Sequence, residues 1–171
     1  MRSYLRATIA IVILTMAAAS VVAGPEDDVY ENLGAQPVTT APDVVQIYAV
    51  QAAFHRAASA KDLSLMMSLW ADDATFTVGG QTSRGKTQIR AWFANVAGSF
   101  KPQNSWVSLT PSQKIRISVQ GDRATLYFEC HYVDVKTGEV KSQMAADTTL
   151  IRSNGKWVIK DLKAGPANLS Q

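Results

Sequence analysis

Residues 54–76 constrain the fold of this chain more than any other segment. An apolar stripe with helical spacing ends at Lys61-Asp62, and a second stripe then runs into the sequence Trp-Ala-Asp-Asp-Ala-Thr-Phe at residues 70–76. Apolar residues three and four positions apart lie on one side of a helix. The segment therefore predicts two consecutive helices that lead directly into a strand.

Hydrophobic periodicity predicts three helices in all. The stripes are Ile47, Val50, Phe54, Ala57 and Ala58 in the first helix, Leu63, Met66, Met67 and Trp70 in the second, and Ile89, Trp92, Phe93 and Val96 in the third. Asp43 is expected to cap the first helix. Alternating patterns predict strands at residues 75–78, 106–110, 114–120, 123–135, 140–152 and 157–163. Helices on one face of a sheet are the architecture that this order favours.

The N-terminus has the pattern of an export signal. Arg2 and Arg6 precede an uncharged apolar run at residues 7–19, and small residues follow at Ala19 and Ala23. The run is short for a membrane span, which needs about 20 apolar residues. We expect a signal peptide at residues 1–23, cleaved before Ser20 or Gly24, and a protein exported to the periplasm or secreted. An uncleaved membrane anchor is the alternative.

Three further segments complete the expected organisation. Residues 24–41 are rich in Pro, Thr and acidic residues without periodicity, which predicts a flexible lead. We expect one folded domain at residues 42–165. A C-terminal tail follows at residues 166–171.

Charge and cysteine content exclude several classes of partner. The signal contains two of the 17 Lys and Arg residues, so 15 remain against 14 Asp and Glu, and no more than two basic residues are consecutive in the rest. We therefore expect no nucleic-acid partner, and no membrane contact after signal cleavage. The single Cys130 allows no internal disulfide. Two His and one Cys without ligand spacing predict no metal site, and we expect no cofactor.

The order of these elements over residues 44–163 resembles the nuclear transport factor 2-like superfamily, in particular its SnoaL-like and ketosteroid-isomerase-like branches. The resemblance implies an α+β, cone-shaped nuclear transport factor 2-like fold. In that fold three N-terminal helices pack on a curved, mostly antiparallel sheet and enclose a cavity. The residues of the cavity differ between the enzymes and the binding proteins of the superfamily, so function depends on the site.

Ketosteroid isomerases resemble this chain but differ at the reacting groups. They carry a Tyr on the first helix, an Asp just after the Ala-Asp-Asp-Ala-Thr segment, and an acidic group on a later strand. In this chain those positions fall on Phe54, Val78 and Asp147. Two of the three cannot do the chemistry, so we do not expect steroid isomerisation.

Residues 123–135 have two faces of different character. One face holds Leu126, Phe128, Cys130 and Tyr132, and the other holds Tyr127, Glu129 and His131 among its polar residues. The pattern alone buries the apolar face against the helices. The resemblance implies the reverse, with the polar face lining the cavity, and we adopt this second interpretation as the prediction.

The connection to the next strand decides which side chains share that face. A two-residue turn at Thr137-Gly138 would place His131 on one face with Met144. A three-residue loop at residues 136–138, with Gly138 left-handed, would instead set Tyr127 opposite Asp147 and His131 opposite Gln143. Glycine at the third loop position favours the second register.

The predicted site follows from this register and from the resemblance. A histidine beside carboxylates is suited to acid–base chemistry near neutral pH, so the catalytic candidates are His131, Asp147 and Tyr127. The ligand-binding candidates are Phe54, Met66, Trp70, Trp92, Phe93, Glu129 and Gln143.

Three functions remain open from the sequence. The first is an exported protein that binds a small, mainly apolar molecule in its cone-shaped cavity. The second is a lyase or isomerase of the polyketide cyclase or dehydratase type, with His131 as general acid and base. The third is an interaction module without a ligand. If the polar face lines the cone, Leu126, Phe128 and Tyr132 form an apolar outer face, which predicts a homodimer through that face.

Overall fold

The computed structural model describes residues 42–110 and 114–167. The expected signal peptide and flexible lead lie outside the described residues, as do the last four residues of the expected tail. Within the described part of the chain, no helix is long and apolar enough to cross a membrane.

Three α-helices form at the predicted places. They are α2 (Pro42–Ala60), α3 (Leu63–Ser68) and α4 (Gly85–Asn95), and a short 3-10 helix, η1 (Gly98–Phe100), follows α4. The predicted stripe of α2 is buried, with Ile47 and Ala57 fully enclosed. Asp43 lies inside the first turn of α2, not before it. Its carboxylate accepts hydrogen bonds from Arg152 (2.7 Å) and from the indole of Trp157 (3.2 Å).

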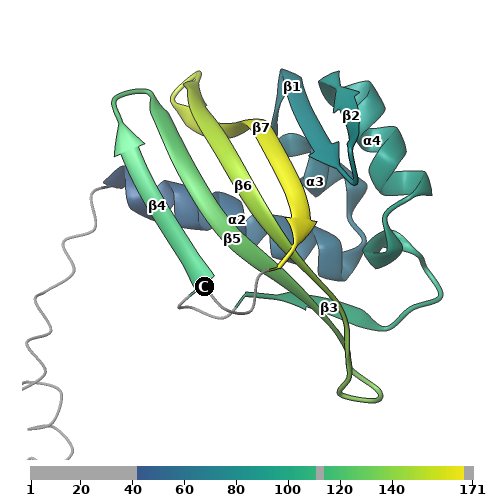
Figure 1. The fold of residues 1–171 in the computed structure, drawn as a ribbon. Coiled ribbons are helices and arrows are strands. Elements are labelled where there is room, and N and C mark those ends of the chain that lie inside the picture. The colour runs from purple at the N-terminus through teal and green to yellow at the C-terminus, as the bar shows by residue number, and fades with distance from the viewer. Residues whose placement is uncertain (1–41, 111–113, 168–171) are drawn as a thin grey trace, which may run out of the picture. The chain divides into compact units, whose positions relative to one another are not determined.

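The seven strands form one sheet (Figure 1). Their bounds are β1 (Trp70–Val78), β2 (Gln81–Arg84), β3 (Trp106–Leu109), β4 (Ile115–Gln120), β5 (Arg123–Asp134), β6 (Val140–Ser153) and β7 (Lys156–Pro166). The order is β2-β1-β7-β6-β5-β3, and β4 pairs with the other half of β5. Only β1 and β7 are parallel, so the sheet is mostly antiparallel, as predicted.

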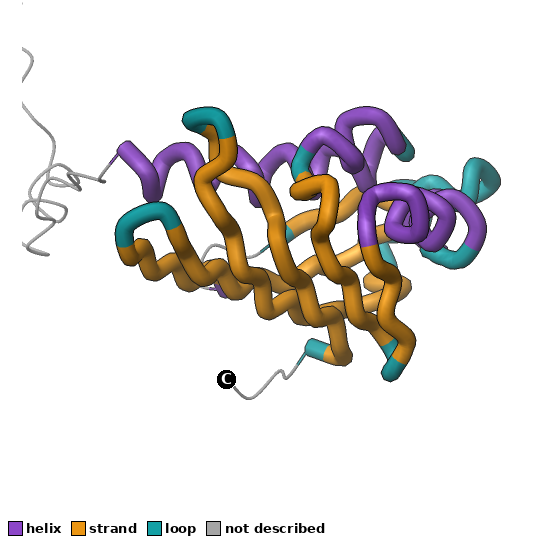
Figure 2. Tube along the Cα trace, turned by 90° about the horizontal axis from the view of Figure 1, so that it is seen from above, coloured by secondary structure: helices purple, strands orange, loops and turns teal. Residues whose placement is uncertain are grey.

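The helices cover one face of the curved sheet (Figure 2). Phe54 of α2 packs edge-on against Phe128 of β5, with ring centroids 5.3 Å apart. Leu126 and Phe128 are each only 1% exposed. The apolar face of β5 therefore lies under the helices, as the pattern alone indicated. The prediction that its polar face lines the cavity is wrong, because burying that face would have left this apolar surface in water.

The β5–β6 hairpin has the predicted register. Tyr127 lies opposite Asp147 and His131 lies opposite Gln143. The loop itself differs, since four residues (135–138) separate Asp134 from Glu139, and the Asp134 amide donates to the Glu139 carbonyl. Gly138 is left-handed, with φ of 73°. Beyond the loop the register shifts by one residue between Val140 and Ser142, so Lys141 forms a β-bulge that restores the predicted pairing.

Three local predictions differ from the structure. Trp70 is the first residue of β1 and not the end of α3, although it is buried. Val96 follows α4 and is 59% exposed, so it is not part of the buried stripe. Strand β2 was not predicted, because its four residues contain no apolar side chain.

Candidate functional site

A cavity of about 410 Å³ lies between α4, η1 and the helix-covered face of the sheet. Most of its wall is aromatic or aliphatic. The aromatic lining residues are Phe54, Phe76, Trp92, Phe93, Trp106 and Tyr132. Phe54 and Phe93 are almost fully buried, whereas Val96 on the rim is exposed. The cavity is therefore a mainly apolar pocket that reaches the surface.

Small side chains on the sheet leave the space for this cavity. Ala146 of β6 lies opposite Ala164 of β7, and Ala164 lies beside Val78 of β1. All three residues line the cavity. Larger side chains at the two alanines would fill the volume above them. The cavity thus exists because the residues in this row across β6, β7 and β1 have small side chains.

Four lining residues carry polar side-chain groups other than a thiol or an indole, namely Ser99, Tyr132, Lys141 and Ser142. Burial raises the pKa of the Tyr132 hydroxyl well above its ordinary value, so this group stays protonated. The Cys130 thiol also lines the cavity, and burial raises its pKa to about 12. A protonated thiol is a poor nucleophile, so Cys130 acts as a small apolar wall residue.

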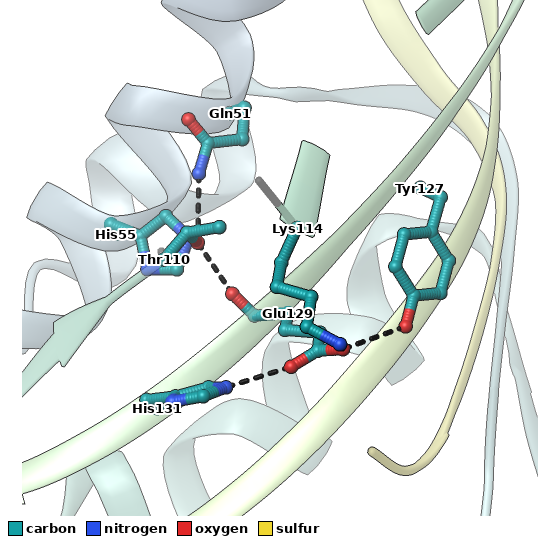
Figure 3. Close-up of polar contacts among 7 residues, drawn as sticks. All are labelled: Gln51, His55, Thr110, Lys114, Tyr127, Glu129 and His131. Atoms are coloured by element: carbon teal, nitrogen blue, oxygen red, sulfur yellow. Dashed lines mark hydrogen bonds and ion pairs between the residues drawn. The ribbon is translucent and has the colours of Figure 1, made fainter. Parts of the chain in front are cut away.

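A second set of polar residues lies behind the wall (Figure 3). His55 of α2 is buried, and its Nδ1 is 2.6 Å from the hydroxyl of Ser108 on β3. Its Nε2 contacts the hydroxyl of Thr110, which also accepts a hydrogen bond from Gln51 (3.0 Å). Thr110 in turn donates to the carbonyl of Glu129. The set links α2 to β5 at the gap between β3 and β4.

These contacts determine the tautomer of His55. The single proton of the Thr110 hydroxyl is donated to the Glu129 carbonyl, so His55 must donate from Nε2 to Thr110. Nδ1 is then unprotonated and accepts from Ser108. Burial is the main cause that lowers the pKa of His55 to about 4, and the charge of His131 is the second cause. His55 is therefore neutral at pH 7.

The predicted polar patch lies on the opposite face of the sheet. The Glu129 carboxylate is completely buried and accepts hydrogen bonds from Tyr127 (2.9 Å) and from His131 (2.8 Å), with the Lys114 ammonium 3.5 Å away (Figure 3). Burial raises the pKa of Glu129, but the hydrogen bonds from His131 and Tyr127 and the Lys114 charge outweigh it and lower that pKa. The carboxylate is ionised and fully satisfied, which is the arrangement of a structural ion cluster.

The predicted catalytic residues therefore share a face, but not the face of the cavity. Tyr127 and Asp147 instead line a shallow hollow of about 390 Å³ on the outer face. There the guanidinium of Arg116 stacks on the ring of Tyr127, 3.9 Å from its centroid. His131 lines neither hollow. Since the sheet separates this face from the cavity, His131, Asp147 and Tyr127 cannot reach a molecule held there.

The ligand-binding candidates divide into three groups. Phe54, Trp92 and Phe93 line the cavity. Met66 and Trp70 are buried in the core without lining it. Glu129 and Gln143 lie on the outer face with His131, because side chains alternate along a strand.

Sequence reasoning missed the polar residues of the cavity. Tyr132 belongs to the apolar face of β5, and strand alternation alone would have placed it there. Lys141 lines the cavity because of the bulge, which no sequence pattern indicated. No sequence pattern indicated the role of His55, because its contacts with Ser108 and Thr110 join residues more than 50 positions apart.

Comparison with known proteins agrees with this architecture. The family model of the SnoaL-like domain matches residues 39–163. The chain belongs to this family. No curated protein matches the sequence.

Solved structures show the same fold for this SnoaL-like domain. A protein of unknown function with a cystatin-like fold from Nostoc punctiforme is 17% identical with a TM-score of 0.62, covering 77% of this chain and 98% of its own. A nuclear transport factor 2-like protein with a cystatin-like fold from Novosphingobium aromaticivorans is 18% identical with a TM-score of 0.63, covering 72% and 81%. The predicted α+β nuclear transport factor 2-like fold is confirmed. At this identity the likeness extends to the fold alone.

A third similar structure carries no assigned activity either. It is a nuclear transport factor 2-like protein of unknown function from Pseudomonas putida, 15% identical with a TM-score of 0.62, covering 73% of this chain and 87% of its own. Function must therefore come from the residues of this SnoaL-like domain itself.

Proposed function

We propose that this SnoaL-like domain binds a small molecule with a flat, mainly apolar body in its cavity. The observation that supports this proposal is the composition of the wall, where six aromatic side chains surround a space of about 410 Å³. That volume is within the range of sites for small organic ligands, which bury most of an apolar ligand and orient it with a few polar groups. Tyr132 and Ser99 are suited to that orienting role.

The chemistry of the wall favours binding over acid–base catalysis. In the described lining there is no Asp, Glu or His. The Tyr132 hydroxyl stays protonated, so it acts as a hydrogen-bonding group and not as a base. A lyase or isomerase remains the alternative proposal, but His131 cannot serve it from the outer face. That alternative would need Tyr132 as its proton donor.

Thermal shift tests the binding proposal. Naphthalene derivatives and other small aromatic compounds are added to the protein expressed without the expected signal peptide, at residues 24–171. A compound at ten times its dissociation constant stabilises the folded state by about 1.4 kcal/mol, which raises the melting temperature by roughly 5 °C. If no apolar or aromatic compound raises it, the proposal fails.

Paired variants locate the binding. Ala164→Phe fills the cavity and should abolish the thermal shift, while Thr125→Phe adds the same side chain to the exposed outer face and should leave it intact. Ala146→Leu is a second, smaller filling change for the case in which Ala164→Phe does not fold. Equal shifts in the filled and unfilled proteins would mean that the compounds bind elsewhere.

The oligomeric state is a separate proposal. The residues that motivated a homodimer, Leu126 and Phe128, are buried under the helices. A dimer through the outer face would therefore have to use polar residues such as Arg116 and Asp147. Light scattering at micromolar concentration tests whether the protein forms that dimer.

A further inference from the structure

Lys141 is the only charged residue in the described lining of the cavity. It is the extra residue of the bulge in β6, where Val133 pairs with Val140 and Tyr132 pairs with Ser142. Regular alternation would put only one of two consecutive residues on the cavity side of the sheet. Lys141 and Ser142 both line the cavity, and Lys141 brings a cation to a described wall that is otherwise uncharged. The bulge places Lys141 out of the regular alternation of β6.

The ion pair of Lys141 supports this placement. Its ammonium pairs with the carboxylate of Glu139, two residues earlier on the same face. The side chain of Lys141 is 34% exposed and that of Glu139 is 62% exposed. The aliphatic stem of Lys141 thus lies against the protein while its charge reaches water at the rim. The Glu139 carboxylate also accepts a long hydrogen bond from Thr137 (3.3 Å), and both exposed contacts cost little to break when Glu139 turns into solvent.

We infer that the cavity selects ligands with an apolar ring body and an anionic head group, such as a carboxylate, that pairs with Lys141 in place of Glu139. The ring occupies the aromatic part of the wall near Phe54 and Phe93, and the head group remains at the rim. The Lys141 ammonium keeps one carboxylate partner in this exchange, while the displaced Glu139 carboxylate is hydrated and screened in solvent. Asp134 and Lys136, the other charged residues of the loop, offset each other in sign. This inference rests on the proposed function.

Calorimetric titration with three naphthalene probes tests the inference. Naphthoate, naphthylmethanol and naphthylmethylamine share the ring and differ in the charge of the head group. Naphthoate should bind about fivefold more tightly than the alcohol, the scale expected for a partly exposed ion pair. The difference should shrink at high salt, since screening weakens such pairs.

Matched variants separate a local contact from general charge. Lys141→Met should remove the preference for naphthoate, and Lys141→Arg should retain it. Lys136→Met removes the same charge from the same loop outside the lining and should leave the preference unchanged.

Each other result has a distinct meaning. Equal affinity for the acid and the alcohol, or equal loss of the preference in both methionine variants, overturns the inference while ligand binding stands. Tightest binding of the amine also overturns it, because Glu139 would then contact the head group. Failure of all three probes to bind, together with no thermal shift from any compound, removes the proposed function and the inference with it.

Discussion

At the scale of single residues, His55 has the most unusual environment in the described structure. Its ring is buried between Phe54 and Phe128, and both nitrogens are used by hydroxyl groups. A second proton on Nδ1 would meet the proton of Ser108 and would place a charge among aromatic rings. His55 therefore stabilises the fold as a neutral side chain.

The lowered pKa of His55 predicts a loss of stability in acid. A histidine in the unfolded chain has a pKa of 6.5, and that of folded His55 is about 4. Between these values the unfolded state binds more protons, so the free energy of unfolding falls as the pH drops from about 6.5 to 4. The contribution is complete above pH 6.5, and its loss is at most about 3 kcal/mol.

Urea unfolding at pH 7 and pH 4.5 measures this effect. His55→Gln should be less stable than the parent at pH 7 and should lose less stability between the two values. His131→Gln removes the other histidine and leaves His55 in place. Because the charge of His131 is only the second cause of the lowered pKa of His55, this control should keep most of the loss in acid. If His55→Gln loses as much stability in acid as the parent does, the titration of His55 is not the cause.

At the scale of elements, two consecutive residues at the junction of α2 and α3 end one helix and start the next. Lys61 adopts a left-handed conformation with φ of 58°, which ends α2. Asp62 then accepts hydrogen bonds from the amides of Ser64 and Leu65, both at 2.9 Å, and starts α3. The short helix α3 has only six residues, so its start depends strongly on this cap.

Asp62→Ala should lower the free energy of unfolding by about 1 kcal/mol, because it leaves two amides of the first turn without their acceptor. Asp62→Asn keeps a side-chain oxygen at the same place and should retain most of the stability. Urea unfolding of both variants checks the prediction. Equal losses in the two variants would show that the charge of Asp62 matters and not its capping oxygen.

The hairpin of β5 and β6 has one feature that the sequence predicted, its register, and one that it did not, the bulge. Gly138 indicated a left-handed residue, and the register that followed from it, with Tyr127 opposite Asp147, is confirmed. The actual loop has one residue more, and the bulge at Lys141 absorbs it. A bulge has no strong local pattern, because its position depends on how the strand must bend over the cavity.

At the scale of the whole molecule, the fold was predictable because helical and strand periodicities are long and agree with each other. The face of the sheet that meets the helices was harder to assign. Alternation separates Phe128 from Glu129, and the pattern alone placed Phe128 under the helices, but the resemblance led to the opposite prediction. Burial energy decides it, since the apolar side chains of β5 gain more from the helices than the polar ones do. Glu129 is buried on the other face because Tyr127 and His131 form hydrogen bonds with its carboxylate and the Lys114 ammonium lies beside it.

Export is the prediction that concerns the whole chain, and the single buried cysteine is compatible with it. The fold is held by packing, and the Cys130 thiol is enclosed with a pKa of about 12, so an oxidising compartment offers it no partner and little reactivity. Expressed from Met1 in a bacterial host with an outer membrane, the chain should be recovered from the periplasm or the medium. Its mass should correspond to a start at Ser20 or Gly24.

Two substitutions distinguish the cleavage sites. Signal peptidase requires a small residue immediately before the cut, so Ala19→Asp should block processing if the mature chain starts at Ser20, and Ala23→Asp should block it if the start is Gly24. Intact-mass spectrometry reads out each case directly. Full-length protein in the membrane fraction would instead support an uncleaved anchor, and full-length protein in the cytoplasm would contradict export. The cytoplasmic result would also change the set of ligands that the aromatic cavity meets, because a protein held inside the cell samples a different pool of small molecules.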